Sequence, residues 1–211
     1  MRLTHFGHAC VLVETDSTRV LIDPGTLSEG YAGLTDLDAV LITHQHGDHL
    51  DVDQLPLLLS ANPDATLYVD TDSAPLVIER GLIPEVVVPG DSIRAGGSTI
   101  DVRGGIHEPV FGDIPGCTNA AYLFDDGALF HPGDSFTLPG RDIDVLALPT
   151  SGPWLRLSDA IEYVQAIAPR VAVPVHERAL ASTATHYGLL SELVPSGTSF
   201  RPLTPGESTA L

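Results

Sequence analysis

The chain has 211 residues, of which 43% are hydrophobic and 18% are charged. This length fits one ordinary domain or two small ones, and the apolar content is enough for a sizeable core, so wholesale disorder is excluded. Apolar runs such as residues 57–59 and 86–88 are far shorter than the roughly 20 residues that span a bilayer. The first residues contain no apolar stretch with a small-residue cleavage site. We therefore expect a single domain over residues 1–211 that is soluble and cytoplasmic and has no membrane partner.

The charge balance is strongly acidic. There are 28 acidic residues against 10 basic ones, a formal net charge of −18, and all ten basic residues are arginine. A chain without lysine excludes a Schiff-base lysine and the lysine of a phosphate-binding P-loop. Nucleic acid is not an expected partner, because its affinity comes largely from cationic side chains. The two cysteines, Cys10 and Cys117, are too few for a disulfide framework and are expected to be structural.

The first half of the chain has the pattern of short strands followed by mixed elements. Apolar-rich runs at residues 2–6, 10–14 and 19–22 are separated by turn residues, and a β-branched run follows at 39–43. Residues 50–60 are predicted to be helical, with Pro56 either in the first turn or at a kink. Strands are expected at residues 66–69, 86–88 and 99–102, with a short helix at 74–80.

The second half alternates strands and helices. Asp125-Asp126-Gly127 between the apolar runs 120–124 and 128–131 predicts a hairpin. Continuous apolar strands at 144–148 and 171–175 flank a helix over 158–168, for which Ser158 is the predicted N-cap. A last helix is expected at 177–193, and residues 195–211 are expected to form a loosely held C-terminal tail. Many short strands with interspersed helices predict a two-sheet α/β architecture.

The segment 44–49 directly follows a buried strand and is dense in metal-ligating side chains, namely His44, His46, Asp48 and His49. A loop that leaves a strand end can curl so that alternate side chains converge, whereas a helix would spread them around its circumference. Imidazole nitrogens and carboxylate oxygens are ligands that Zn²⁺ prefers. The segment therefore predicts a metal site, and a solvated polar turn is the alternative.

Three further residues occur where an apolar strand gives way to a loop, namely His107, Asp134 and His176. Any one of them alone is more often a structural residue. Because strand ends at one rim of a sheet lie close together, one site can collect all of them. Together they strengthen the prediction of a shared metal site.

The complete pattern, His44-x-His46-x-Asp48-His49 followed by His107, Asp134 and His176, resembles the metallo-β-lactamase superfamily of binuclear metallohydrolases. The resemblance implies a four-layer αββα sandwich of two mixed β-sheets flanked by helices, with the site along one edge. It also implies two divalent metal ions, most often zinc, with manganese and iron as alternatives. The first metal would be held by His44, His46 and His107, and the second by Asp48, His49 and His176, with Asp134 as the bridge.

Departures from other branches of the superfamily narrow the expected activity. True β-lactamases carry cysteine where Asp134 falls, and oxygen-reducing diiron members carry glutamate at the position of His46. Nuclease members usually need an inserted domain, for which 211 residues leave little room. The most similar branch is that of compact stand-alone hydrolases, which includes ascorbate-6-phosphate lactonase.

These departures leave hydrolysis of a small-molecule ester, lactone, thioester or phosphoester by a metal-activated hydroxide. Asp48 and Asp134 are the expected catalytic carboxylates, Asp48 because it can both bind metal and orient the hydroxide. Two other readings of the same residues stay open. One is a metal-binding scaffold without turnover, and the other is a mononuclear iron enzyme of redox or sulfur chemistry on the same fold.

Residues outside the ligand pattern receive supporting roles. Asp23 is expected to grip the histidine loop by hydrogen bonds, as metal sites generally require, and His131 is expected to lie under Asp134. His8 could either approach the site or serve only the turn in which it lies. The expected substrate rim consists of Tyr31, Phe111, Trp154 and Arg156.

Overall fold

The structure is a computed structural model that describes residues 1–114 and 116–211. Its first sheet has seven strands in the order β14-β1-β2-β3-β4-β5-β6. Strands β14 to β3 are antiparallel neighbours, whereas β3 to β6 run parallel. The strands are β1 (Arg2–His5), β2 (Val11–Glu14), β3 (Arg19–Ile22), β4 (Ala39–Leu41), β5 (Thr66–Val69), β6 (Glu85–Val86) and β14 (Thr209–Ala210).

The second sheet also has seven strands, in the order β13-β12-β11-β10-β9-β8-β7. Strands β7 to β10 are antiparallel neighbours and β10 to β13 run parallel, so both sheets are mixed. The strands are β7 (Ser92–Ala95), β8 (Ser98–Ile106), β9 (Thr118–Phe124), β10 (Leu129–His131), β11 (Val145–Pro149), β12 (Val171–Val175) and β13 (Ser199–Phe200).

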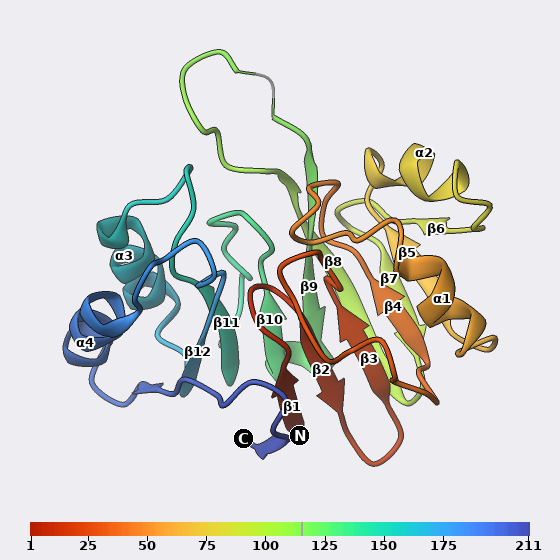
Figure 1. Cartoon of the computed structure of the whole chain (residues 1–211). Helices are drawn as coiled ribbons and strands as arrows, with labels where there is room; N and C mark the ends of the chain where they lie inside the picture. The colour runs from red at the N-terminus through yellow and green to blue at the C-terminus, as the bar shows by residue number, and fades with distance from the viewer. Residues whose placement is uncertain (115) are drawn as a thin grey trace.

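Helices cover the outer face of each sheet (Figure 1). Helices α1 (Leu55–Ser60) and α2 (Ser73–Ile78) lie on the first sheet, and α3 (Leu157–Ile167) and α4 (Ala184–Leu193) lie on the second. The chain is therefore the four-layer αββα sandwich that the family resemblance implies. Within the described residues, no helix combines the length and the apolar character that a membrane crossing requires.

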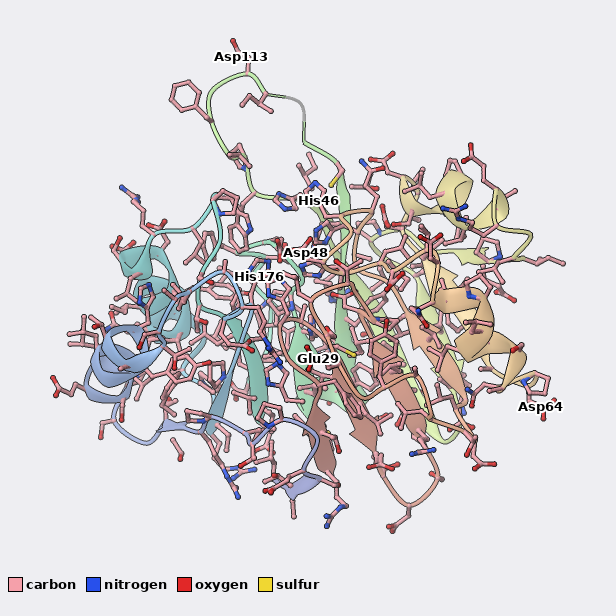
Figure 2. The ribbon with its side chains drawn as sticks, in the orientation of Figure 1. Glu29, His46, Asp48, Asp64, Asp113 and His176 are labelled. Atoms are coloured by element: carbon pink, nitrogen blue, oxygen red, sulfur yellow. The ribbon has the colours of Figure 1, made fainter. Side chains whose placement is uncertain are left out.

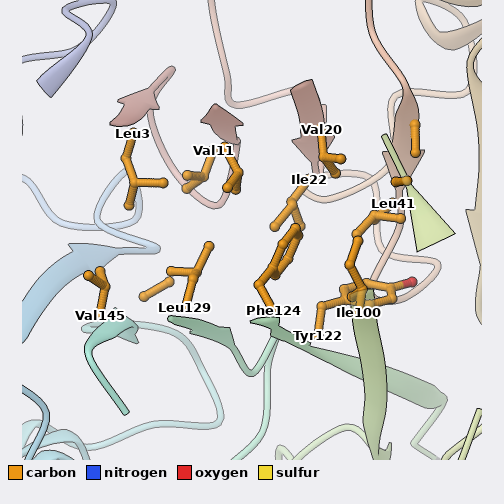
Figure 3. Packing of buried hydrophobic residues seen from close by; sticks show 14 of the residues in the cluster. Leu3, Val11, Val20, Ile22, Leu41, Ile100, Tyr122, Phe124, Leu129 and Val145 are labelled. Carbon is orange, nitrogen blue, oxygen red and sulfur yellow. The ribbon is translucent and has the colours of Figure 1, made fainter. Parts of the chain in front are cut away.

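Alternation along the strands builds the core on both sides of each sheet. In β3, Val20 and Ile22 point between the sheets, whereas Leu21 points outward beneath the helices. Figure 3 shows the central layer, where Leu3 and Ile22 of the first sheet face Leu129 and Phe124 of the second. Because successive strand side chains alternate between faces, one apolar strand serves two layers at once.

The predicted hairpin is confirmed, because β9 and β10 pair antiparallel with Leu129 opposite Phe124, and the 3-10 turn η1 (Asp125–Gly127) joins them. Helices α1, α2 and α4 are shorter than predicted, whereas α3 keeps its predicted length. Helix α1 begins at Leu55, because the carboxylate of Asp51 accepts the backbone N–H groups of Asp53 and Gln54 and so ends the preceding loop. Pro56 lies in the first turn of the helix.

The two C-terminal helices also start elsewhere than predicted. α3 begins at Leu157, so its N-cap is Arg156 and not Ser158, and the Asp159 carboxylate accepts the backbone N–H of Arg156. α4 begins at Ala184 and not at residue 177, because Glu177 leaves the helical path and its carboxylate accepts a backbone N–H from the β1–β2 turn.

The expectation of a loose tail over residues 195–211 is wrong. Its strand β13 pairs with β12, and its strand β14 pairs with β1, where Arg2 lies opposite Ala210. Both chain ends therefore lie together at the edge of the first sheet, as Figure 1 shows. The strand β7 was not predicted from the sequence, since its burial is partial and its apolar content low.

The hydroxyl of Tyr122 links the two sheets beneath the loop that carries the histidines. Tyr122 is fully buried in β9, and it donates a 2.7 Å hydrogen bond to the carbonyl of Ile42. We expect Tyr122→Phe to lower the free energy of unfolding by about 1–3 kcal/mol, because the buried carbonyl loses its donor. Urea unfolding measures this loss. The control is Tyr187→Phe in α4, whose ring packs on Phe200 at the periphery, and an equal loss in both variants would contradict the role of Tyr122.

Candidate metal centre

Loops at one edge of the sandwich bring all seven predicted ligands together. The segment 44–49 follows β4, and His107, Asp134 and His176 follow β8, β10 and β12. Figure 2 shows His46, Asp48 and His176 at this edge, where the two sheets meet. The carboxyl ends of these strands share one rim, so loops from both sheets converge there.

The first group of donor atoms belongs to His44, His46 and His107, whose ligand atoms lie within 4.8 Å of one another. His44 Nε2 is 3.0 Å from His46 Nδ1, and the rings of His46 and His107 are 4.7 Å apart. His107 Nδ1–H donates to the carbonyl of Glu108 at 2.6 Å, which leaves Nε2 as the free ligand atom. This group matches the first predicted metal position.

The second group belongs to Asp48, His49, His176 and, in addition, His8. Asp48 Oδ2 lies 3.5 Å from His176 Nε2 and 4.0 Å from His49 Nε2. It also accepts a 2.9 Å hydrogen bond from His8 Nε2. The three predicted residues are therefore together, and a fourth side chain joins them.

Asp134 lies between the two groups. Its Oδ2 atom is 3.3 Å from Nε2 of His107 in the first group and 3.1 Å from Nε2 of His176 in the second. Its Oδ1 atom is 3.1 Å from His49 Nε2. One carboxylate thus faces both sets of imidazoles, as a bridging ligand must.

Five buried imidazole nitrogens have no hydrogen bond of normal geometry within the described part of the chain, namely Nδ1 of His8 and His176 and Nε2 of His49, His107 and His176. A buried polar atom without a partner costs free energy unless something else satisfies it. The three Nε2 atoms point at the Asp134 carboxylate from different sides. The residues present therefore fit metal cations, which these nitrogens and oxygens would bind.

Asp23 fixes the loop from behind, as the sequence predicts. Its buried carboxylate accepts the backbone N–H of Thr43 at 2.7 Å, the Thr43 hydroxyl at 2.7 Å and His49 Nδ1–H at 2.7 Å. The Thr43 oxygen in turn accepts His44 Nδ1–H at 3.0 Å. One carboxylate therefore sets the orientation of two imidazoles, directly for His49 and through Thr43 for His44.

Gly25 permits this close approach. A Cβ atom at Gly25 would lie 1.9 Å from the backbone oxygen of Asp48, a distance that no real contact reaches. The turn after β3 therefore packs its backbone directly against the histidine loop. Any larger residue would push Asp48 and His49 away from the centre.

The directions of the pKa shifts at the site favour the binding of cations. Burial opposes the charge of Asp48 and Asp134, but surrounding histidines outweigh it and hold the pKa of both carboxyls well below the usual range. Burial lowers the pKa of His44 and His46, so both rings are neutral ligands at pH 7. For His49, the carboxylates of Asp134 and Asp23 outweigh burial and raise the pKa.

Two residues beside Asp134 complete its surroundings. Trp154 Nε1–H donates to Asp134 Oδ2 at 2.8 Å. His131 lies beneath the Asp134 loop, where its Nδ1 accepts the backbone N–H of Gly133 and its Nε2–H donates to the carbonyl of Ala9. Both residues therefore restrain Asp134, one at its carboxylate and the other through the backbone.

A cleft of about 150 Å³ opens onto the centre. Of the expected rim residues, Trp154 alone lines it. Tyr31 is buried in the core beneath α1, with its hydroxyl 3.4 Å from the Pro24 carbonyl, and Phe111 is 77% exposed on the loop after His107. The Arg156 side chain is 85% exposed and pairs with Asp159 at the start of α3. The lining residues are His46, Asp48, His107, Val110, Asp134, Pro153, Trp154 and His176.

Two residues have a place at the centre that sequence reasoning did not assign. The sequence allows either a turn role or a site role for His8, and the structure places its ring 3.9 Å from the ring of His176. The sequence predicts a structural role for Cys117, and the structure places its sulfur 4.0 Å from His46 Nε2. The pair Gly7-His8 between two predicted strands is the sequence signal that could have placed His8 at the site, because a turn at that rim directs its side chains toward the centre.

Known proteins are similar to this chain in sequence and in fold. Residues 2–176 match the family described as the beta-lactamase superfamily domain. The chain is 44% identical to protein Rv0786c of Mycobacterium tuberculosis over 199 residues, which cover 92% of each chain. It is 30% identical to the UPF0173 metal-dependent hydrolase of Opitutus terrae, with 99% of both chains covered. Igni18, a metallo hydrolase of Ignicoccus hospitalis, shares the fold with a TM-score of 0.72 at 22% identity, over 99% of this chain and 97% of that chain.

The hold of Asp23 on the loop can be tested by an isosteric change. We expect Asp23→Asn to weaken metal binding by about 10- to 100-fold, because His49 and Thr43 lose the charged acceptor that orients them. Competition with a chelator of known affinity measures this change. Asp64→Asn is the matched control, since Asp64 is an exposed carboxylate far from the site (Figure 2). Equal affinities in both variants would contradict the role of Asp23.

Proton release on metal binding follows from the pKa directions. At pH 7 the metal-free chain carries a proton on His49, whose pKa is raised, while His44 and His46 are neutral and both site carboxyls are ionised. A metal ligand must lose its proton, so we expect binding at pH 7 to release the proton of His49 and affinity to rise with pH. Calorimetric titration in two buffers of different ionisation enthalpy counts the protons. Binding that releases none would contradict a ligand role for His49.

Proposed function

The chain belongs to the metallo-β-lactamase superfamily and is a metal-dependent hydrolase, and we propose that it holds two divalent metal ions and cleaves a small-molecule ester, lactone, thioester or phosphoester. The observation that carries this proposal is the position of Asp134. Its Oδ2 atom lies within 3.3 Å of one imidazole of each group. Two ligand groups that share one carboxylate favour a pair of metals over a single one.

The proposed ligand roles follow the two groups. His44, His46 and His107 would hold the first metal, and Asp48, His49 and His176 the second, with Asp134 shared. Zinc is the proposed metal, because the donors are imidazoles and carboxylates, and manganese or iron would accept the same donors. When bound, such a pair would lower the pKa of a coordinated water to about 7 and would polarise the oxygen of the scissile bond.

The residues of the chain position the reactants. Asp48 is half-buried and ionised, so its carboxylate can accept a hydrogen bond from an attacking water and orient it. Trp154 holds Asp134 Oδ2 and, with Val110 and Pro153, forms an apolar wall that limits water on one side of the cleft. Low local dielectric strengthens the electrostatic interactions within the site.

The cleft limits the substrate in size and charge. Its volume of about 150 Å³ suits a small molecule, and none of its described lining residues is an arginine. A polyanionic substrate would be repelled by the chain, whose formal net charge is −18. We therefore propose a small neutral or singly anionic substrate with an apolar part beside Val110 and Trp154, and no nucleic acid substrate.

The test combines metal analysis with a substrate screen. We expect about two zinc or manganese ions per chain and turnover of at least one small ester, lactone, thioester or phosphodiester. Labelled single- and double-stranded oligonucleotides are screened in parallel at physiological salt. One iron ion per chain without hydrolysis would favour a mononuclear redox enzyme, and bound metal without any turnover would favour a scaffold. Salt-sensitive micromolar binding to oligonucleotides would overturn the small-molecule substrate.

Asp134→Asn probes the shared carboxylate. We expect this variant to bind one metal or none and to lose turnover, because the amide cannot bridge two cations as the carboxylate does. Elemental analysis after dialysis against zinc gives the metal content. The control is Asp16→Asn, an exposed residue in the β2–β3 turn at the opposite edge of the sheet. An Asp134→Asn variant with two metals and full activity would contradict the assignment of the bridge.

A further inference from the structure

His8 is a fully buried polar side chain that the proposed ligand set does not use. It lies in the turn between β1 and β2, is 0% exposed, and its ring packs 3.9 Å from the ring of His176. Its Nε2 atom is 2.9 Å from Asp48 Oδ2. A buried imidazole at this place requires a physical reason beyond the turn.

The direction of the hydrogen bond is fixed by the carboxylate. Asp48 is ionised and can only accept, so His8 Nε2 carries the hydrogen and donates it. The accepting oxygen is the same Oδ2 atom that lies 3.5 Å from His176 Nε2 and 4.0 Å from His49 Nε2. The bond therefore holds the oxygen that faces the second group of ligands.

The main chain around His8 presets the direction of its ring. His8 has a φ of +53°, in the left-handed region, and follows Gly7 at +91°. Its backbone N–H donates to Glu177 Oε1 at 3.1 Å, and its carbonyl accepts from His5 Nε2 at 2.9 Å and from the His176 backbone N–H at 2.8 Å. A conformation of this kind persists only where surrounding contacts determine it.

We propose that His8 is the positioning residue of the second metal site, because its Nε2–H holds Asp48 Oδ2 toward His49 and His176. The proposal rests on the binuclear site proposed above. Without this donor, the Asp48 side chain is free to rotate on its partly exposed side, and the second metal is bound more weakly. The first metal has no ligand in contact with His8 and keeps its affinity.

A ligand role for His8 is disfavoured by the same hydrogen bond. Binding a cation through Nε2 would require loss of the hydrogen that this atom donates to Asp48. Asp48 would then lose its donor at the moment when its orientation matters most. His8 therefore acts through Asp48, and its effect must depend on the donor and not on the imidazole as such.

Two substitutions separate the donor from the rest of the side chain. His8→Gln places an amide N–H near the position of Nε2, whereas His8→Asn is too short to reach Asp48. Asparagine tolerates a positive φ well, so His8→Asn keeps the turn while it removes the hydrogen bond. The control is His186→Gln, the same chemical change on α4, away from the centre.

Zinc titration of the metal-free proteins is the test, with metal content by elemental analysis and Trp154 fluorescence as readouts. Trp154 is the single tryptophan of the chain and its indole donates to Asp134, so its emission reports metal at the shared carboxylate. We expect His8→Asn to weaken the second zinc by about 10- to 100-fold and to leave the first unchanged. His8→Gln should recover most of the affinity, and His186→Gln should match the wild type.

The outcomes are distinct. If His8→Asn keeps both zinc affinities, or if it weakens the first zinc as much as the second, the positioning role is wrong. If a folded His8→Gln loses the second zinc as fully as His8→Asn, the imidazole itself is required and His8 is a ligand. Thermal melting of the metal-free variants establishes folding. Wild-type protein that takes up only one zinc contradicts the binuclear proposal itself. Wild-type protein with two zinc ions and no turnover contradicts hydrolysis, and the zinc affinities of the His8 variants still test the positioning role.

Discussion

The buried carboxylate of Asp23 is the interaction on which the metal centre depends. It is 0% exposed, and a buried charge is costly unless donors surround it. Here the donors are the backbone and hydroxyl of Thr43 and the Nδ1–H of His49, all at 2.7 Å. Satisfying this charge forces the end of β3 against the start of the histidine loop. The same contacts turn Nε2 of His49 toward the centre, so the hydrogen bonds that satisfy the buried charge also orient a candidate metal ligand.

The sandwich makes this local arrangement possible. Because strand side chains alternate, the ends of β4, β8, β10 and β12 are held at one rim by the layer of apolar side chains between the sheets. The rim residues themselves are under backbone strain, since His8, Asp23 and His176 have φ values of +53°, +49° and +63°. Left-handed conformations at three non-glycine residues around one centre are held in place by the rigid packing below them.

The fold and the site were predictable to different degrees. The pattern of short strands was enough to predict a two-sheet α/β architecture, because it depends on local spacing, whereas the four layers were implied by the family resemblance of the ligand pattern. The tail was mispredicted because β13 and β14 are two-residue strands, which carry no periodicity and exist only by pairing with β12 and β1. The rim was mispredicted for Tyr31 because burial beneath α1 is a tertiary contact that loop position does not reveal. His8 stayed open because a turn residue and a residue of the site share one sequence pattern.

The two carboxylates that face the ligands are held in a consistent way. His8 donates to Asp48 and Trp154 donates to Asp134, and each donor is an uncharged N–H group once His8 is neutral, as burial favours by lowering its pKa. The chain has ten arginines, yet within the described residues none pairs with Asp23, Asp48 or Asp134, whose ion-pair partners are all histidines. An arginine in place of His8 or Trp154 would orient the carboxylate equally well, but its permanent positive charge would repel a metal cation and neutralise the charge of the carboxylate. A neutral donor orients the oxygen and preserves its negative charge for the cation, which is the physical requirement that separates a metal centre from a buried salt bridge.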